Sequence, residues 1–207
     1  MILTRDTFER SLDVSRETMA RLDIHAALLA KWAPRINLVS RDSLPHLWHR
    51  HIADSAQLWR LRPPHARLWL DLGSGAGFPG VVIAAFAAEA SDLTVRLVES
   101  DARKSAFLAS VIREAALPAE VVTARIEDLP PQSADVVSAR ALAPLTSLLA
   151  MTENHRRPDG IGLFPKGRTV HKEIEEAART WRFAPVVHPS VTDPAAGIVE
   201  IGVLDRV

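Results

Sequence analysis

The glycine-rich segment LDLGSGAGFPG, from Leu70 to Gly80, constrains the fold of this 207-residue chain more than any other feature. It follows a short apolar run at residues 68–70 and precedes a longer apolar stretch from Val81. This order predicts a strand, a glycine loop and the first turn of a helix, where a ligand can approach both the loop backbone and the helix N-terminus. Without a ligand, the alternating glycines would only add chain entropy to be lost on folding. The segment therefore predicts an α/β fold that binds a nucleotide or nucleoside.

Strand-type and helix-type segments alternate along the rest of the chain. Short runs of strand type lie at residues 94–98, 120–123, 135–138 and 161–164. Helix-sized segments lie between and after them, at residues 81–90, 102–116, 145–154 and 170–181. This alternation predicts a doubly wound, mostly parallel sheet with helices on both faces. The last apolar run, residues 197–204, predicts an antiparallel closing strand that pairs near Val186 and Val187.

The N-terminal part has a different pattern. An apolar stripe at helical spacing runs from Met19 to Leu29, and Pro34 ends that helix. A second helix is expected from about Ser43 to His51. Residues 1–62 therefore predict a helical extension packed on a core formed by residues 63–207.

Composition narrows the class of protein. The 25 basic and 25 acidic residues give zero net charge, which argues against non-specific RNA binding. However, 21 of the basic residues are arginines and only 4 are lysines, and arginine is the better donor to phosphates and guanine edges. The absence of cysteine excludes disulfides, thiolate zinc sites and cysteine nucleophiles. No apolar run spans a bilayer and the N-terminus lacks a secretory signal, so we expect a cytoplasmic protein with no membrane partner. Histidines 25, 46, 49 and 51 lack the spacing of a zinc site, and no metal is predicted.

Two cofactor classes compete for the glycine loop. The spacing Gly75-x-Gly77-x-x-Gly80, with Glu99 about 20 residues further on, satisfies the dinucleotide fingerprint of NAD enzymes. Counted from Gly73, the same segment is an acidic residue followed by G-x-G-x-G, the loop with which methyltransferases bind S-adenosylmethionine. Glu99 ends a predicted strand and is suited to both ribose hydroxyls in either case.

Four features favour S-adenosylmethionine. Asp71 ends the first strand, where a carboxylate can meet the methionine ammonium directly or through water. Pro79 stiffens the helix start that normally receives a pyrophosphate, and the loop has no nearby Arg or Lys for a diphosphate. No second mononucleotide half is evident. Apart from these four features, backbone groups of Ile126 and Glu127 after the third strand, or a side chain there, could bind the amino edge of an adenine.

Several short motifs resemble the ribosomal RNA small subunit methyltransferase G family, also known as glucose-inhibited division protein B. They are N37-L-V-S40, R50-H51-x-x-D54-S55, the glycine loop D71 to G80 with its F78-P79, R125-x-E127 and S138-A-R140-A, within residues 30–170. The resemblance implies a class I S-adenosylmethionine-dependent methyltransferase with an N-terminal helical cap. It also implies methyl transfer to N7 of a guanine in bacterial small-subunit (16S) ribosomal RNA, free or in a ribosomal particle.

The expected site residues fall into two groups. The resemblance implies cofactor contacts at Gly73, Phe78, Ile126, Glu127 and Arg140, to which the loop pattern adds Asp71, Gly75, Gly77 and Glu99. Arg140 ends the fourth strand, where it suits a guanine, a phosphate or the cofactor carboxylate, and it is expected to position the reactants without a general base. The RNA-binding candidates are Asn37, Arg50, His51, Arg103, Lys104, Arg125 and Lys166.

Some alternatives stay open. Arg50 and Asp54 are four residues apart, and the plainer interpretation of that spacing is an ion pair on a helix surface. A methyltransferase that acts on a small molecule, or a nucleoside-binding module without catalysis, would also use the glycine loop. We expect a monomer that binds ribosomal RNA.

Overall fold

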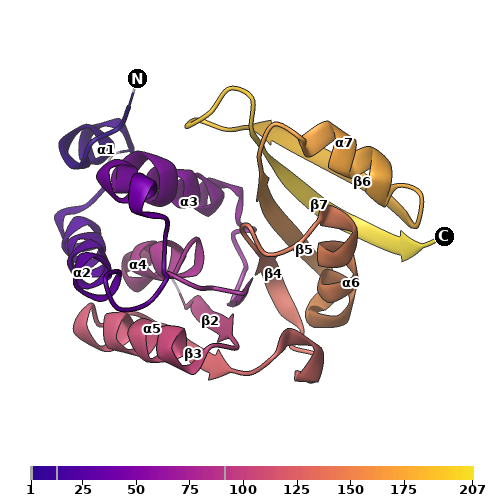
Figure 1. Cartoon of the computed structure of the whole chain (residues 1–207). Coiled ribbons are helices and arrows are strands. Elements are labelled where there is room, and N and C mark those ends of the chain that lie inside the picture. The colour runs from indigo at the N-terminus through magenta and orange to yellow at the C-terminus, as the bar shows by residue number, and fades with distance from the viewer. Residues whose placement is uncertain (1, 13, 91) are drawn as a thin grey trace.

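The computed structural model describes residues 2–12, 14–90 and 92–207 as one sheet flanked by helices. The strand order is β3-β2-β1-β4-β5-β7-β6 (Figure 1). Neighbours among β1 to β5 are parallel, whereas β7 lies antiparallel between β5 and β6. The strands are β1 (Leu68–Leu72), β2 (Thr94–Glu99), β3 (Ala119–Thr123), β4 (Ala134–Ser138), β5 (Arg156–Lys166), β6 (Trp181–Pro189) and β7 (Gly197–Arg206).

The sheet confirms the predicted mostly parallel architecture and its antiparallel closing strand. Val186 pairs with Glu200 and Val187 with Val199, as the closing hairpin requires. The prediction that a helix extends from residue 170 to 181 was wrong at its end. The helix stops at Ala177, and Trp181 begins β6, because its ring is buried in the core beneath the β6–β7 hairpin.

The helices cover both faces of the sheet. One face carries α2 (Arg16–Trp32), α4 (Gly80–Ala90) and α5 (Ala102–Glu114), and the other carries α6 (Leu145–His155) and α7 (Val170–Ala177), as Figure 1 shows. The N-terminal part adds α1 (Arg5–Leu12), η1 (Arg41–His46), η2 (Trp48–Ala53), α3 (Asp54–Ala56) and η3 (Gln57–Leu61), and η4 (Ile126–Asp128) follows β3. None of the described helices is both long enough and apolar enough to cross a membrane.

The segment expected as one helix from Ser43 to His51 has a different backbone. A 3₁₀ turn contains Pro45 and gives way at Trp48 to a π-helical turn. The helical segment begins at Arg41, and an α-helix from that residue would need an N–H at position 45 to bond the carbonyl of residue 41. Proline lacks this N–H, so a continuous α-helix would lose a hydrogen bond. The π turn then places Arg50 and His51 beside the sheet edge, a position that periodicity alone does not define.

The N-terminal helices share one hydrophobic core with the sheet. Met19, Leu22 and Leu29 of α2 are almost fully buried in the same cluster as Val82 of α4 and Phe107 of α5. A polar contact adds to this packing, because Glu89 of α4 accepts hydrogen bonds from side chains at the start of α2. The N-terminal helices and the sheet are therefore joined mainly by continuous apolar packing. The domain boundary at residue 62 stays a prediction.

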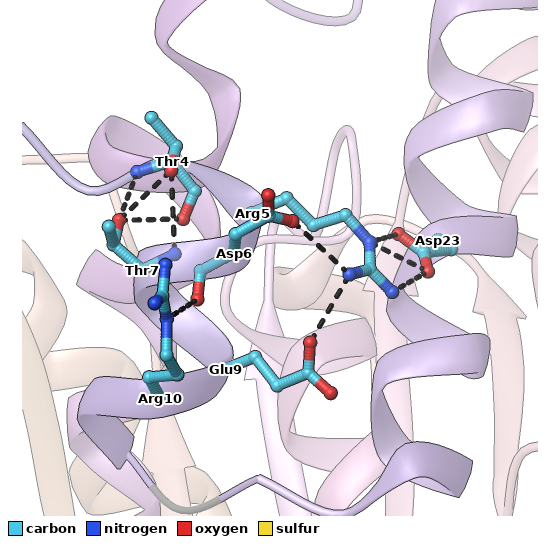
Figure 2. A network of polar contacts seen from close by, with 7 residues as sticks. All are labelled: Thr4, Arg5, Asp6, Thr7, Glu9, Arg10 and Asp23. Carbon is cyan, nitrogen blue, oxygen red and sulfur yellow. Dashed lines mark hydrogen bonds and ion pairs between the residues drawn. The ribbon is translucent and has the colours of Figure 1, made fainter.

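Helix α1 is attached to α2 by charge. Arg5 donates from Nε to Asp23 Oδ1 at 2.9 Å and from Nη2 to Asp23 Oδ2 at 2.6 Å, and it also reaches Glu9 (Figure 2). Both partners of the Arg5–Asp23 pair are about 40% exposed, so solvent screens the attraction. The apolar anchor of α1 is Phe8, which is fully buried against the ring of Trp48.

Candidate cofactor and substrate site

The glycine loop between β1 and α4 adopts a backbone that only glycine favours. Gly73, Gly75 and Gly77 have φ values of +66°, +53° and +89°. A Cβ added at Gly77 would collide with Val81, whereas one added at Gly75 would meet nothing nearer than 3.7 Å. The loop is therefore tightly packed against α4 on one side and open at Gly75, as a ligand-binding loop must be.

Asp71 is fully buried and holds the loop in place. Its Oδ1 accepts a hydrogen bond from Ser138 Oγ at 2.7 Å, and its Oδ2 accepts one from the Gly80 N–H at 3.2 Å. Burial raises the pKa of Asp71 to about 6, against the opposing effect of these hydrogen bonds. The carboxylate thus joins β1, β4 and the start of α4, and its predicted contact with a methionine ammonium stays a prediction.

Glu99 connects the glycine loop to the next helix. At the end of β2, its Oε2 accepts from the Gly75 N–H at 2.9 Å and its Oε1 accepts from the Asp101 N–H at 2.8 Å. Asp101 in turn caps α5. This brings the two predicted cofactor residues, Glu99 and Gly75, into direct contact at the carboxyl edge of the sheet.

The turn after β3 forms a smaller hollow of about 340 Å³ with the outer face of α6. Ile126 is buried there and Glu127 is exposed, and both line the hollow. On the α6 side the lining residues are Ser147, Ala150, Met151, Asn154 and His155. This volume is large enough for a heterocyclic base, and the expected adenine position at Ile126 and Glu127 stays a prediction.

Arg140 is the centre of a compact polar cluster. Its Nη2 donates to His51 Nδ1 at 2.7 Å, and its Nη1 donates to the Arg50 carbonyl at 3.0 Å and to Asp54 Oδ2 at 3.3 Å. The guanidinium carbon lies 5.1 Å from the ring centre of Phe78. The alternative of a surface ion pair between Arg50 and Asp54, left open by their spacing, is not what the structure has, because the carboxylate of Asp54 pairs with Arg140, which is 86 residues away in sequence.

His51 is neutral in this cluster. A guanidinium can only donate, so Nδ1 is the acceptor and Nε2 carries the ring proton. Burial, together with the charges of Arg140 and Arg50, lowers the pKa of His51 to about 3. The ring also stacks on Phe78 with 5.0 Å between centres. If His51 contacts RNA as predicted, it would therefore do so as a neutral ring and not through a positive charge.

His25 belongs to the same region, although sequence reasoning assigned it no role. Its Nε2 lies 2.8 Å from the Ala76 carbonyl in the glycine loop, and its ring lies 4.9 Å from that of Phe78. Burial lowers its pKa to about 4. The sequence pattern could have indicated that His25 is buried, because His25 follows Leu22 by three residues and so lies on the same, buried face of α2.

A larger cleft of about 1250 Å³ opens beside Arg140. Its walls come from the N-terminal cap, the segment after β4, the start of α7 and the β6–β7 loop. Arg50, His51, Arg140 and Lys166 are the predicted site residues that line it. Other lining residues include His46, His49, Asp54, Gln57, Leu142, Pro144, Arg168, Lys172, Glu173, Ser190, Thr192 and Pro194.

The remaining RNA-binding candidates lie outside the cleft. Arg103 and Lys104 open α5, and Arg125 precedes η4, so all three follow the carboxyl ends of β2 and β3. Asn37 is exposed in the connection after α2. The structure therefore does not bring these four residues together with Arg50 and Arg140.

Lys166 lines the cleft but is already paired. Its Nζ lies 2.8 Å from Glu173 Oε2 and 3.0 Å from the Ala143 carbonyl, and its side chain is only 9% exposed. Glu173 also accepts from the Leu145 N–H at 3.0 Å. Burial raises the pKa of Glu173, but its hydrogen bond and charge contact with Lys166 outweigh this, and the net pKa is lowered. An RNA phosphate would have to compete with Glu173 for this ammonium.

Comparison with known proteins gives the family. A family model described as rRNA small subunit methyltransferase G matches residues 18–199. Ribosomal RNA small subunit methyltransferase G from Cereibacter sphaeroides is 50% identical over 198 residues, covering 95% of each chain. The protein of that name from Ruegeria pomeroyi is also 50% identical, covering 95% of this chain and 97% of its own.

Solved structures give the fold. A methyltransferase from Geobacter sulfurreducens has a TM-score of 0.58 at 13% identity, covering 92% of this chain and 97% of its own. TYW2 from M. jannaschii in complex with AdoMet has a TM-score of 0.57 at 14% identity, covering 84% of this chain and 80% of its own. The predicted class I methyltransferase fold is thereby confirmed. Because the family model and the curated relatives match nearly the whole chain, the chain belongs to the rRNA small subunit methyltransferase G family.

Proposed function

We propose that this protein transfers the methyl group of S-adenosylmethionine to N7 of a guanine in bacterial small-subunit (16S) ribosomal RNA. Family membership supports the reaction class. The observation that carries the proposal is the position of Arg140, whose guanidinium lies over Phe78 of the glycine loop and also lines the large cleft. A donor held by the loop and an acceptor held in the cleft would meet at this residue.

The residues around the loop fit S-adenosylmethionine. The open backbone at Gly75 leaves room for the methionine part, and the Glu99 carboxylate beside it can accept hydrogen bonds from both ribose hydroxyls. The hollow at Ile126 and Glu127 supports an adenine position. The proposed cofactor contacts are Asp71, Gly73, Gly75, Gly77, Phe78, Glu99, Ile126, Glu127 and Arg140.

The chemistry requires alignment more than proton transfer. S-adenosylmethionine, when bound, supplies an electrophilic methyl group, and neutral guanine N7 has a lone pair but no proton. No general base is needed, and His51 and His25, with pKa values of about 3 and about 4, are poor bases at neutral pH. Arg140 is the proposed catalytic residue, because its planar fork can donate to acceptors on the guanine edge or to the cofactor carboxylate.

The RNA contacts are proposed on both sides of Arg140. Arg50 lies at the cleft, and Arg103, Lys104 and Arg125 lie beyond the ends of β2 and β3. Asn37, His51 and Lys166 complete the set, and the charge of Lys166 is shared with Glu173. We propose that a cytoplasmic monomer binds the RNA, free or in a ribosomal particle.

The direct test is methyl transfer from labelled S-adenosylmethionine to ribosomal RNA taken from a strain that lacks this protein. Nucleoside mass spectrometry should detect 7-methylguanosine in the small-subunit RNA. Free RNA and whole small subunits are compared in parallel to identify the substrate. Labelling of small molecules in the extract without labelling of RNA would contradict the proposal, and binding of S-adenosylmethionine without any turnover would indicate a nucleoside-binding module.

A further inference from the structure

Asp54 contacts two segments that are far from it in sequence, at Arg140 and at Thr192, as well as the neighbouring Gln57. Its Oδ2 lies 3.3 Å from Arg140 Nη1, and its Oδ1 accepts from Thr192 Oγ1 at 3.1 Å and from Gln57 Nε2 at 3.0 Å. Arg140 and Asp54 are 17% and 19% exposed, so the pair is largely shielded from solvent. One carboxylate thus contacts both the guanidinium beside the glycine loop and a residue of the β6–β7 loop.

The β6–β7 loop, residues 190–196, is attached to the cap at the same place. Gln57 Oε1 accepts from the Val191 N–H at 3.0 Å, and Ser190 Oγ and Thr192 Oγ1 lie 3.0 Å apart. Ser190 and Thr192 line the cleft. This loop therefore forms a cleft wall whose hydrogen bonds lead back to Asp54.

Arg140 depends on Asp54 for its charge balance. Among the described residues, Asp54 is the carboxylate that forms an ion pair with this guanidinium, and the other two acceptors, the Arg50 carbonyl and His51 Nδ1, are neutral. Burial lowers the pKa of Arg140, and the charge of Asp54 opposes that effect. Without Asp54 the guanidinium would keep two hydrogen bonds to neutral acceptors, and its largely buried charge would have no carboxylate in contact.

We infer that Asp54 is a positioning residue that sets the orientation of the Arg140 guanidinium and couples it to the β6–β7 wall of the cleft. This inference rests on the proposed function, in which Arg140 contacts the cofactor and aligns the guanine. RNA that contacts the β6–β7 loop would act on Arg140 through Thr192 and Asp54. Binding of RNA in the cleft and orientation of the reacting groups are therefore linked. Thr192 acts on Arg140 only through Asp54 in this arrangement.

The experiment measures binding of S-adenosylmethionine by calorimetry and single-turnover methyl transfer to 16S ribosomal RNA. Asp54→Ala should weaken cofactor binding about tenfold, and Thr192→Val about threefold, because one charged contact and one neutral hydrogen bond are lost. The double variant should bind no more weakly than Asp54→Ala, since both changes remove the same connection. Thr192→Ser should restore wild-type affinity, because it restores the hydroxyl.

Two controls separate positioning from folding. Glu153→Gln removes an exposed ion pair with Arg206 far from the cleft and should change neither affinity nor rate. Melting temperatures identify loss of fold, and if Asp54→Ala unfolds, Asp54→Asn and the loop variant Thr192→Val decide the question. Additive losses in the double variant, or wild-type affinity and rate in Thr192→Val, would overturn the inference. Wild-type protein that binds S-adenosylmethionine but methylates no RNA would refute the proposed function, while the affinities would still decide the role of Asp54.

Discussion

At the residue scale, the site is organised around the ring of Phe78. His25 from α2, His51 from η2 and Arg140 from the end of β4 all contact this ring. The sequence indicated Phe78 and Arg140 through their motifs, but it could not show that His25 joins them. The reason is physical, because stacking and hydrogen-bond partners 50 or more residues apart depend on how α2 packs on the sheet.

The first prediction concerns Glu99. Its replacement by alanine removes the carboxylate that faces Gly75 and should weaken S-adenosylmethionine binding by roughly 10–100-fold, the range expected for charged hydrogen bonds. Calorimetry measures the change. Glu114→Ala, at the exposed end of α5, is the matched control and should bind normally. Unchanged affinity in a folded Glu99→Ala protein would remove the ribose contact from the site.

The second prediction concerns the pH dependence of the reaction. Because N7 carries no proton, and because His51 and His25 have pKa values of about 3 and about 4, no histidine of this cluster titrates near neutrality. The single-turnover rate should therefore be flat from about pH 7 to 9, whereas a general base would give a limb that reports its own pKa. Arg140→Ala should lower the rate across that whole range, and Arg140→Lys should rescue poorly because an ammonium lacks the planar fork. A steep limb near pH 7 that disappears in His51→Asn would point to an oxygen or exocyclic nucleophile.

At the element scale, the strands were predictable and the turns between helices were not. The runs at residues 68–70 and 135–138 lie within β1 and β4, where residues such as Trp69, Val136 and Val137 suit a strand that is buried on both faces. The 3₁₀ and π turns around Pro45 and Trp48 were not predicted, because Pro45 signals only an interruption of an α-helix and the spacing of apolar residues does not distinguish these turns from an α-helix. The partner of Lys166 was equally unpredictable, since the ion pair with Glu173 depends on how the end of β5 meets α7.

The third prediction separates a structural from an RNA-binding role of Lys166. Lys166→Ala leaves the partly buried Glu173 without its ion pair and should destabilise the fold by about 2–4 kcal/mol in urea denaturation, somewhat less than for a fully buried pair. Its effect on RNA binding should be small. Lys104→Ala should do the reverse, with normal stability and a salt slope of RNA binding reduced by about one. A reduced slope in Lys166→Ala with unchanged stability would instead assign Lys166 to the RNA-binding surface.

At the scale of the whole molecule, the cap and the core are joined by both apolar packing and buried titratable groups. Met19 and Leu29 lie in the same cluster as α4 and α5, and His25 bridges the cap to the glycine loop. The glycine loop is consequently supported from two sides, by Asp71 within the sheet and by His25 from α2. The sequence predicted the extension but not this support, because a histidine on an apolar helix face does not reveal its partner.

The last prediction is that His25 makes the fold sensitive to acid. Its pKa is about 4 in the folded chain and 6.5 when unfolded, so between these values the unfolded chain binds the proton and stability falls as pH decreases. Asp71 acts in the opposite direction, because its folded pKa of about 6 exceeds the unfolded value of 3.8 and the folded state gains stability as pH falls through that window. Each group contributes a slope of at most about 1.4 kcal/mol per pH unit, and the unfolded histidine is only about half protonated at pH 6.5. His25→Gln should therefore lose about 1.5 kcal/mol less stability than wild type between about pH 6.5 and 5. Urea denaturation at both pH values measures this difference, and Asp71→Asn should change the slope with the opposite sign. Equal losses in wild type and His25→Gln would show that His25 titrates normally and that the buried contact between the cap and the glycine loop does not form in solution.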